Sequence, residues 1–185
     1  MWSFFETVRH RHSVRRYQRD MPVEPEKLHA ILEMACAAPS AGDLQAYHIT
    51  VATRQATREA LAEAAHGQAF VAEAPVLLVF SADPERSAAH YGGRGRQLYA
   101  LQDATIAAAY AQLAVVAAGM GSTWVGAFDE TAVRRILDLP AHLVPVALLS
   151  VGYPAELPEP TPRRRLEEMV RFEEPPQARR RPGGR

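Results

Sequence analysis

The stretch RHRHSVRRY, residues 9–17, concentrates the side chains of this chain that could do chemistry. It holds four arginines, two histidines and a serine within nine residues. Arg11, Ser13 and Arg15 alternate, so in an extended segment their side chains point to the same side. Two guanidiniums that flank a hydroxyl suit a phosphate dianion, because arginine offers a planar bidentate fork. The alternative is a solvated basic turn.

The composition limits the classes of function. The 185 residues carry 21 acidic and 21 basic side chains, so no global field attracts nucleic acid or a membrane. The apolar stretch 104–120 is interrupted by Thr105 and Gln112, which indicates a buried helix rather than a membrane span. The single cysteine, Cys36, cannot form an internal disulfide. We expect a cytoplasmic protein without a signal peptide.

Several familiar catalytic and binding motifs are excluded. Lys27 is the only lysine and lies between Glu26 and Leu28, so the Gly-Lys pair of a phosphate-binding P-loop is lacking. The glycines near residue 120 do not fit GxGxxG, because Trp124 occupies the third place. No GxSxG elbow marks a nucleophilic serine. His10-x-His12 is the only close histidine pair, and we expect no metal site.

Alternating helices and strands must position these groups. Hydrophobic periodicity predicts helices over 1–10, 25–38, 57–66, 97–118 and 130–137, and strands over 48–53, 76–82 and 144–153. These strands are too few for a doubly wound sheet. We therefore expect an α+β sandwich whose mainly antiparallel or mixed sheet has about four to five strands, with helices on both faces.

Two segments are expected to lie outside the regular core. Residues 83–96 are polar and include three glycines, which predicts a mobile excursion. Beyond Pro154 the chain is rich in proline and charge, and it could leave the core and wrap another surface. Residues 1–172 are thus expected to form a single domain, and the Pro/Arg-rich residues 173–185 a disordered tail. Alanines between 104 and 118 would allow another helix to approach closely.

Six segments, taken together and in order, resemble the nitroreductase family of FMN-dependent oxidoreductases. They are RHSVRRY, APSAGDLQ, GQAFVAEAPVLLVF, GMGSTWVGAF, VALLSVGYPAE and RRRLEEMV. Each motif alone is weak, but their common order runs from about Arg9 to Val170, nearly the whole chain. The resemblance implies the same fold, and a homodimer with two FMN sites built from both chains at the interface.

The resemblance also assigns cofactor contacts. The N-terminal ligands of the flavin phosphate and ribityl chain match Arg11, His12, Ser13 and Arg15, and the C-terminal phosphate contacts match Arg163, with Arg164 or Arg165. The loop on the isoalloxazine face matches Pro39, Ser40 and Ala41, with Asp43 and Gln68 at further flavin-contacting positions. The turn whose backbone amide addresses the hydride-accepting nitrogen matches Val125, Gly126 and Ala127.

The implied activity is hydride transfer from NAD(P)H through tightly bound FMN to nitroaromatic, quinone or related acceptors, with ping-pong kinetics. The flavin carries this chemistry, so no catalytic side chain is required. Asp43 stands where asparagine is common, and Ala46-Tyr47 where proline and tryptophan are frequent. These departures and the short 83–96 excursion leave the acceptor open. Two alternatives stay open: a specialised relative (a dehalogenase, flavin destructase or azoline oxidase) and a flavin-binding protein without turnover.

Overall fold

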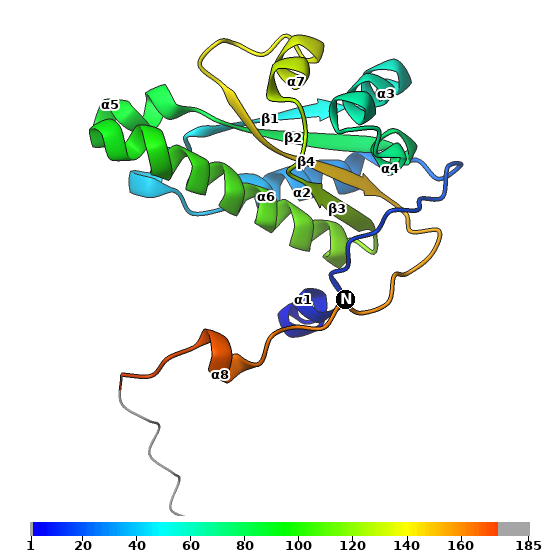
Figure 1. Cartoon of the computed structure of the whole chain (residues 1–185). Coiled ribbons are helices and arrows are strands. Elements are labelled where there is room, and N and C mark those ends of the chain that lie inside the picture. The colour runs from blue at the N-terminus through cyan, green and yellow to red at the C-terminus, as the bar shows by residue number, and fades with distance from the viewer. Residues whose placement is uncertain (1, 174–185) are drawn as a thin grey trace, which may run out of the picture.

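The fold is built on a four-stranded antiparallel sheet in the order β1-β2-β4-β3 (Figure 1). A computed structural model describes residues 2–173. The strands are β1 (Tyr47–Ala52), β2 (Val76–Ala82), β3 (Gly121–Val125) and β4 (Val144–Gly152). All of β2 is buried, because helices cover both faces of the central strands. Such a strand reads as one continuous apolar run without alternation.

Helices on both sides of the sheet complete the sandwich, as expected. One core cluster joins the sheet to α2 (Pro25–Cys36) and α6 (Ala100–Ala117) through residues such as Ile31 and Phe80. The other joins it to α3 (Gln55–Ala64), α4 (Ala69–Glu73) and α7 (Glu130–Ile136). The expected fold class is confirmed, although α4 was not anticipated.

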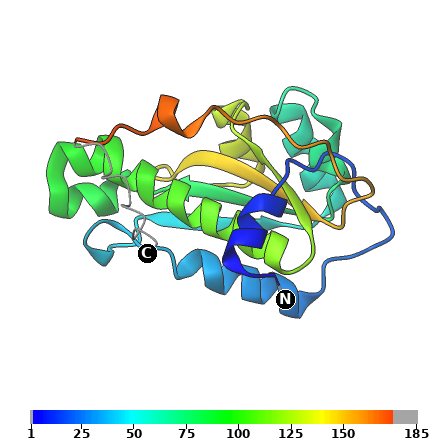
Figure 2. The ribbon, with the colours of Figure 1, turned by 90° about the horizontal axis from the view of Figure 1, so that it is seen from below.

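Helix α6 runs the length of the sheet. Its buried alanines, including Ala104, Ala107 and Ala111, let the helix lie close to the strands. Among the described residues, one helical stretch, Pro84–Ala117, is long and apolar enough by composition to cross a membrane. Its α6 part packs along the sheet (Figures 1 and 2), which is the arrangement of the core helix of a soluble protein.

Both ends of the described chain leave apolar side chains on the surface. Helix α1 (Phe4–His10), capped by Ser3 and Glu6, lies across the C-terminal half of α6 (Figure 2). After β4 the chain leaves the body and carries α8 (Leu166–Met169) away from it (Figure 1). Of the expected disordered tail, residues 174–185 lie outside the described part.

The expectation of a mobile excursion at 83–96 was wrong. These residues form helix α5 (Pro84–Arg94), and the π-helix η2 (Gly95–Tyr99) connects it to α6. The Asp83 side chain caps α5 by accepting from the Arg86 N–H at 3.0 Å, and Pro84 occupies the first turn. Gly92, at φ 57°, kinks the helix without ending it. The helix start signals at Asp83 and Pro84 thus determine the structure of this segment despite its three glycines.

Residues 121–125 form strand β3, which is not among the strands that hydrophobic periodicity predicts. The strand pairs with β4, and the basic N-terminal segment covers its other edge. Ser122 and Thr123 are buried there. Small polar residues resemble a turn in sequence, but here both edges of the strand are occupied.

Candidate functional site

The basic segment is extended and anchored to β3. The Val14 N–H donates to the Ser122 carbonyl oxygen at 3.0 Å, and the Thr123 hydroxyl donates to the Val14 carbonyl oxygen. A Cβ added at Gly121 would lie 2.6 Å from the Val14 side chain, so only glycine permits this approach. Val14 is buried, whereas the residues on either side of it are not. Alternation therefore turns Ser13 and Arg15 away from the core.

Tyr17 fastens the end of this segment to the sheet. Its hydroxyl donates to the Val14 carbonyl oxygen at 2.8 Å and lies 2.7 Å from the Ser150 hydroxyl. Burial raises the pKa of Tyr17 to about 12, because the phenolate would be poorly solvated there.

We expect this raised pKa to make the fold sensitive to alkali. Between pH 10 and 12 the unfolded tyrosine loses its proton while buried Tyr17 keeps it, so stability falls as pH rises, by about 2–3 kcal/mol. Urea unfolding at pH 8 and pH 11 measures the part of this loss that is reached by pH 11, about 1.4 kcal/mol. In Tyr17→Phe, which lacks the titrating group, the loss should be smaller by that amount. Equal losses in both proteins would contradict this account.

Arg11 and Arg163, from opposite ends of the chain, are near enough for their charges to interact. Burial lowers the pKa of Arg11, and the positive charge of Arg163 lowers it further. Within residues 2–173 neither guanidinium forms a salt bridge to a carboxylate. Two like charges held together without a counterion repel each other. An anion with several oxygens, such as a phosphate, would relieve that repulsion.

The neighbouring arginines are engaged elsewhere. Arg164 pairs with Glu168 at 3.3 Å, and Arg165 pairs with Glu167 at 2.6 Å. Of the three arginines at 163–165, Arg163 is therefore the one with its charge uncompensated by a carboxylate of the described chain.

Further site residues gather beside the basic segment. The Arg15 guanidinium lies 5.8 Å from the centre of the Phe70 ring. Phe70 and Val125 belong to one apolar cluster, and Gly126 follows Val125 at the end of β3. Gln68, at the start of α4, donates to the Ala65 carbonyl oxygen at 2.8 Å. His12, on the other side of the segment, lines a cavity of about 260 Å³ with Val116 and Gly121.

The 39–46 loop lies at the start of α6. Its short 3-10 turn, η1 (Ala41–Asp43), has positive φ at Gly42 and Asp43, and Gln45 follows at φ 50°. Such angles are costly for residues with side chains, so other contacts must hold the loop. The Ser40 hydroxyl accepts from the Gln45 N–H at 2.9 Å. Asp43 is exposed.

Asp103 of α6 is the main anchor of this loop, and the motifs did not reveal it. Its side chain is only 2% exposed, and it accepts from the backbone N–H groups of Ala41 at 2.9 Å and Ala46 at 3.4 Å. The available signal was its position, because it is the lone charged residue between residues 97 and 118. A buried charge in an apolar helix requires partners.

We expect Asp103→Ala to loosen the loop. Two buried or half-buried N–H groups lose their acceptor, which should cost about 1–3 kcal/mol of unfolding free energy. Hydrogen exchange at Ala41 and Ala46 should speed up more than exchange in β2. Asp103→Asn keeps one acceptor oxygen and should behave as an intermediate. Unchanged exchange in the alanine variant would show that Asp103 does not hold the loop.

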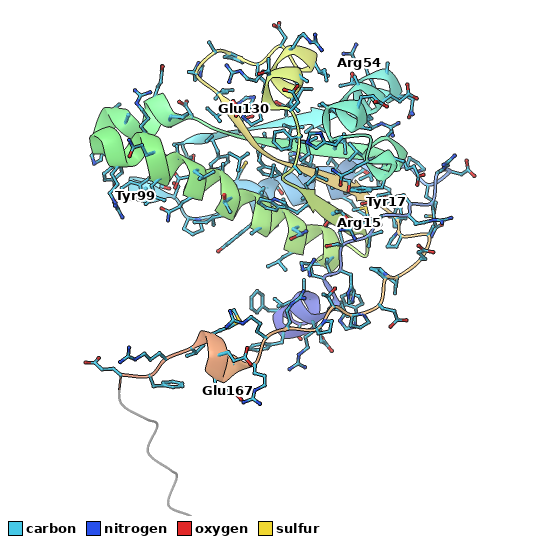
Figure 3. The ribbon with its side chains drawn as sticks, in the orientation of Figure 1. Arg15, Tyr17, Arg54, Tyr99, Glu130 and Glu167 are labelled. Atoms are coloured by element: carbon cyan, nitrogen blue, oxygen red, sulfur yellow. The ribbon has the colours of Figure 1, made fainter. Side chains whose placement is uncertain are left out.

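The loop and the basic segment lie at opposite ends of α6. Asp103 holds the loop near the start of the helix, and Val116 shares the cavity with His12 near its end. Thirteen residues of α-helix span about 20 Å. Figure 3 shows Arg15 and Tyr17 far from Tyr99, which precedes α6. The residues assigned to one cofactor thus form two separate half-sites within the chain.

The residues that the structure describes contain no group of three or more histidine, cysteine or acidic side chains placed to hold a metal. Of the histidine pair, His10 stacks on Trp2 with 4.1 Å between ring centres, and its Nδ1 lies 2.8 Å from the Glu6 carbonyl oxygen. The structure therefore gives His10 a packing role at α1.

Comparison with known proteins agrees with the order of motifs. The model of the nitroreductase family matches residues 8–72 and 67–153, which is well over half of the chain. The chain belongs to the nitroreductase family. The resemblance noted in the sequence is thus confirmed, and the nitroreductase fold with it.

Individual nitroreductase relatives cover most of the chain. A protein of Thermus thermophilus named NADH dehydrogenase is 40% identical over 187 residues, covering 86% of this chain and 91% of its own. The structure of Bacillus megaterium NfrA2 superposes with a TM-score of 0.86 at 28% identity, over 94% of this chain and 75% of that one. The Vibrio harveyi NADPH:FMN oxidoreductase, solved with NAD+, gives 0.84 at 27% identity, over 92% and 77%.

Proposed function

We propose that this nitroreductase is a homodimer that passes a hydride from NAD(P)H through tightly bound FMN to nitroaromatic, quinone or related acceptors, in ping-pong fashion. Family membership and relatives named NAD(P)H nitroreductase and FMN reductase support the enzyme class, an FMN-dependent NAD(P)H oxidoreductase. The observation that carries the proposal for this chain is the basic segment extended along β3, whose Arg11 senses the charge of Arg163 and has no carboxylate partner within residues 2–173.

The residues present fit FMN in both character and arrangement. Arg11, Arg163 and Ser13 would hold the phosphate, with Arg15 along the ribityl chain, whereas His12 lies on the other side of the segment. The exposed backbone after Val125 would address one edge of the ring. FMN would supply the redox chemistry, which leaves the protein to bind, orient and exclude water. This division agrees with the failure of the sequence to yield a nucleophile or a general base.

The two half-sites support the dimer. One chain cannot place its 39–43 loop on a flavin held by its own arginines, because about 20 Å of α6 separates them. A second copy could supply the missing half. An apolar groove of about 440 Å³ between α1, α2 and α6, lined by Phe4, Met34 and Tyr110, offers an interface. The outlying arm 156–173 could then cover the partner.

The location of the enzyme in the cytoplasm is also a proposal. The single cysteine, Cys36, is exposed and leaves the chain without an internal disulfide. A reducing compartment would not harm such a fold, and it supplies NADH and NADPH.

The visible spectrum of the purified protein, recorded anaerobically before and after NADH or NADPH, tests the function. We expect a yellow protein that either donor bleaches, and recovery of the colour when an acceptor is added. A yellow protein that neither donor bleaches would exclude the reductase and favour the flavin-binding alternative. A colourless protein that ignores added FMN would exclude the cofactor itself.

A further inference from the structure

The junction of α5 and α6 carries a surface cluster that the proposed function does not yet use. His90, Tyr91, Arg94 and Tyr99 form this cluster, here called the arginine–tyrosine tip. Tyr91 and Tyr99 meet edge to face with 5.1 Å between ring centres, and His90 packs on Tyr91 at 4.5 Å. The Arg94 guanidinium lies 5.4 Å from the centre of the Tyr99 ring and donates to its hydroxyl at 2.9 Å.

The π-helix η2 creates this cluster. Arg94 and Tyr99 are five residues apart, a spacing at which side chains do not face each other on an α-helix. In η2 the Ala100 N–H donates to the Gly95 carbonyl oxygen, a bond over five residues that brings such positions together. A Cβ at Gly95 would lie 2.5 Å from the Ser87 carbonyl oxygen, so the close packing of η2 on α5 requires glycine.

The tip lies against the 39–46 loop. A Cβ at Gly42 would overlap the Tyr91 hydroxyl, and Arg86 of α5 donates to the Leu44 carbonyl oxygen. Under the proposed function this loop lies on the flavin ring. The tip therefore lies within reach of a ligand that stacks on the same ring and extends past the loop.

The charge of the tip selects an anionic ligand. Arg94 is exposed and makes no salt bridge within residues 2–173, and Arg96 beside it is also exposed. The Tyr99 ring and hydroxyl hold the Arg94 side chain, so less side-chain entropy is lost when it binds. Arginine presents a fork that matches phosphate oxygens.

We propose that the arginine–tyrosine tip binds the phosphate groups of the nicotinamide nucleotide, with Arg94 as the principal contact. This inference rests on the proposed function, because it assumes that the nicotinamide stacks on the flavin beside the 39–46 loop. If the phosphates of the nucleotide are held here, the chain needs no separate nucleotide-binding domain.

Titration of the FMN-loaded protein with NADP+ by calorimetry tests the proposal directly. Arg94→Ala should weaken NADP+ binding about tenfold, the loss of one charge-assisted contact. Arg94→Lys keeps the charge but not the fork, and its affinity for NADP+ should lie between those of Arg94→Ala and the unmodified protein. The matched control is Arg54→Ala, an exposed arginine at the start of α3, well away from Tyr99 (Figure 3). Equal affinities in Arg94→Ala and the unmodified protein would overturn the proposal.

Anaerobic flavin reduction identifies which part of the donor Arg94 contacts. The apparent Kd for NADPH should rise in Arg94→Ala while the rate at saturation stays unchanged, because the lost contact is present throughout the reaction. Reduced nicotinamide riboside, which has no phosphate, should reduce both proteins alike. A matching defect with the riboside would overturn the proposal, as would a defect confined to a carboxylated nitroaromatic acceptor.

Failure of the nucleotide contact can be distinguished from failure of the proposed function. If the unmodified protein takes up no FMN, or its FMN is not bleached by NADPH, the proposed function fails. NADP+ is then titrated against the FMN-free protein. Weaker binding in Arg94→Ala alone would still support the nucleotide contact, and equal or absent binding in all variants would overturn it.

Discussion

An Arg11→Ala/Arg163→Ala double variant is expected to be purified without flavin. Each guanidinium would make charge-assisted hydrogen bonds to the FMN phosphate worth roughly 1.5–3 kcal/mol. Losing both should raise the Kd for FMN by a factor of at least about 100. Fluorescence titration of the apoprotein with FMN measures this directly. Flavin content equal to that of the unmodified protein would show that the pair does not hold the phosphate.

The chain provides a matched control in the adjacent arginines. An Arg164→Ala/Arg165→Ala variant removes the same charge from the same segment, but these side chains already pair with Glu168 and Glu167. It should keep its flavin. The melting temperature of the apoprotein separates lost binding from lost folding. Removing Arg163 relieves its repulsion of Arg11, so the flavin-free double variant should melt no lower than the flavin-free unmodified protein.

Truncation after Glu156 is expected to give a folded monomer without FMN. In the described structure the arm contributes almost nothing to its own body, since Leu166 is 69% exposed and Phe172 is 57% exposed. The contacts that close the sheet edge, such as the Ala155 N–H donating to the Arg16 carbonyl oxygen, remain. Secondary structure should therefore persist while the apolar contacts with a partner are lost.

Sedimentation, circular dichroism and flavin content together measure this result. The full-length Arg163→Ala variant serves as the control, because it removes the phosphate ligand and leaves the apolar arm. It should lose flavin affinity and still sediment as a dimer. If the truncated chain dimerises and retains FMN, the arm is needed neither for dimerisation nor for FMN binding.

The buried sheet was the part of the fold that could best be predicted from the sequence. The apolar runs over 76–82 and 144–153 became the central strands, because a strand covered on both faces needs no polar positions. Strand β3 could not be recognised in this way. Its Ser122 and Thr123 are buried by the N-terminal segment, a contact that depends on residues more than 100 positions away.

Part of the candidate site could also be predicted from the sequence. Motif order assigned the segments of the candidate site, and alternation placed Arg11, Ser13 and Arg15 on one side of the segment provided that it is extended, as the structure shows it to be. Local pattern could not predict that the charge of Arg163 reaches Arg11, or that Asp103 anchors the 39–46 loop, because both depend on tertiary packing. The glycines of α5 led to the wrong prediction of a mobile excursion, since Asp83 and Pro84 begin a helix that tolerates a kink at Gly92.

The separation of the two half-sites along α6 has a genetic consequence if each flavin is shared between two chains. One allele damaged at Arg11 and another damaged in the 39–43 loop would each be inactive alone. In a mixed dimer, the intact arginines of one subunit meet the intact loop of the other. Every such dimer would contain one working site and one doubly defective site. Two recessive lesions in the same gene would therefore complement each other, whereas two lesions in the same half would not.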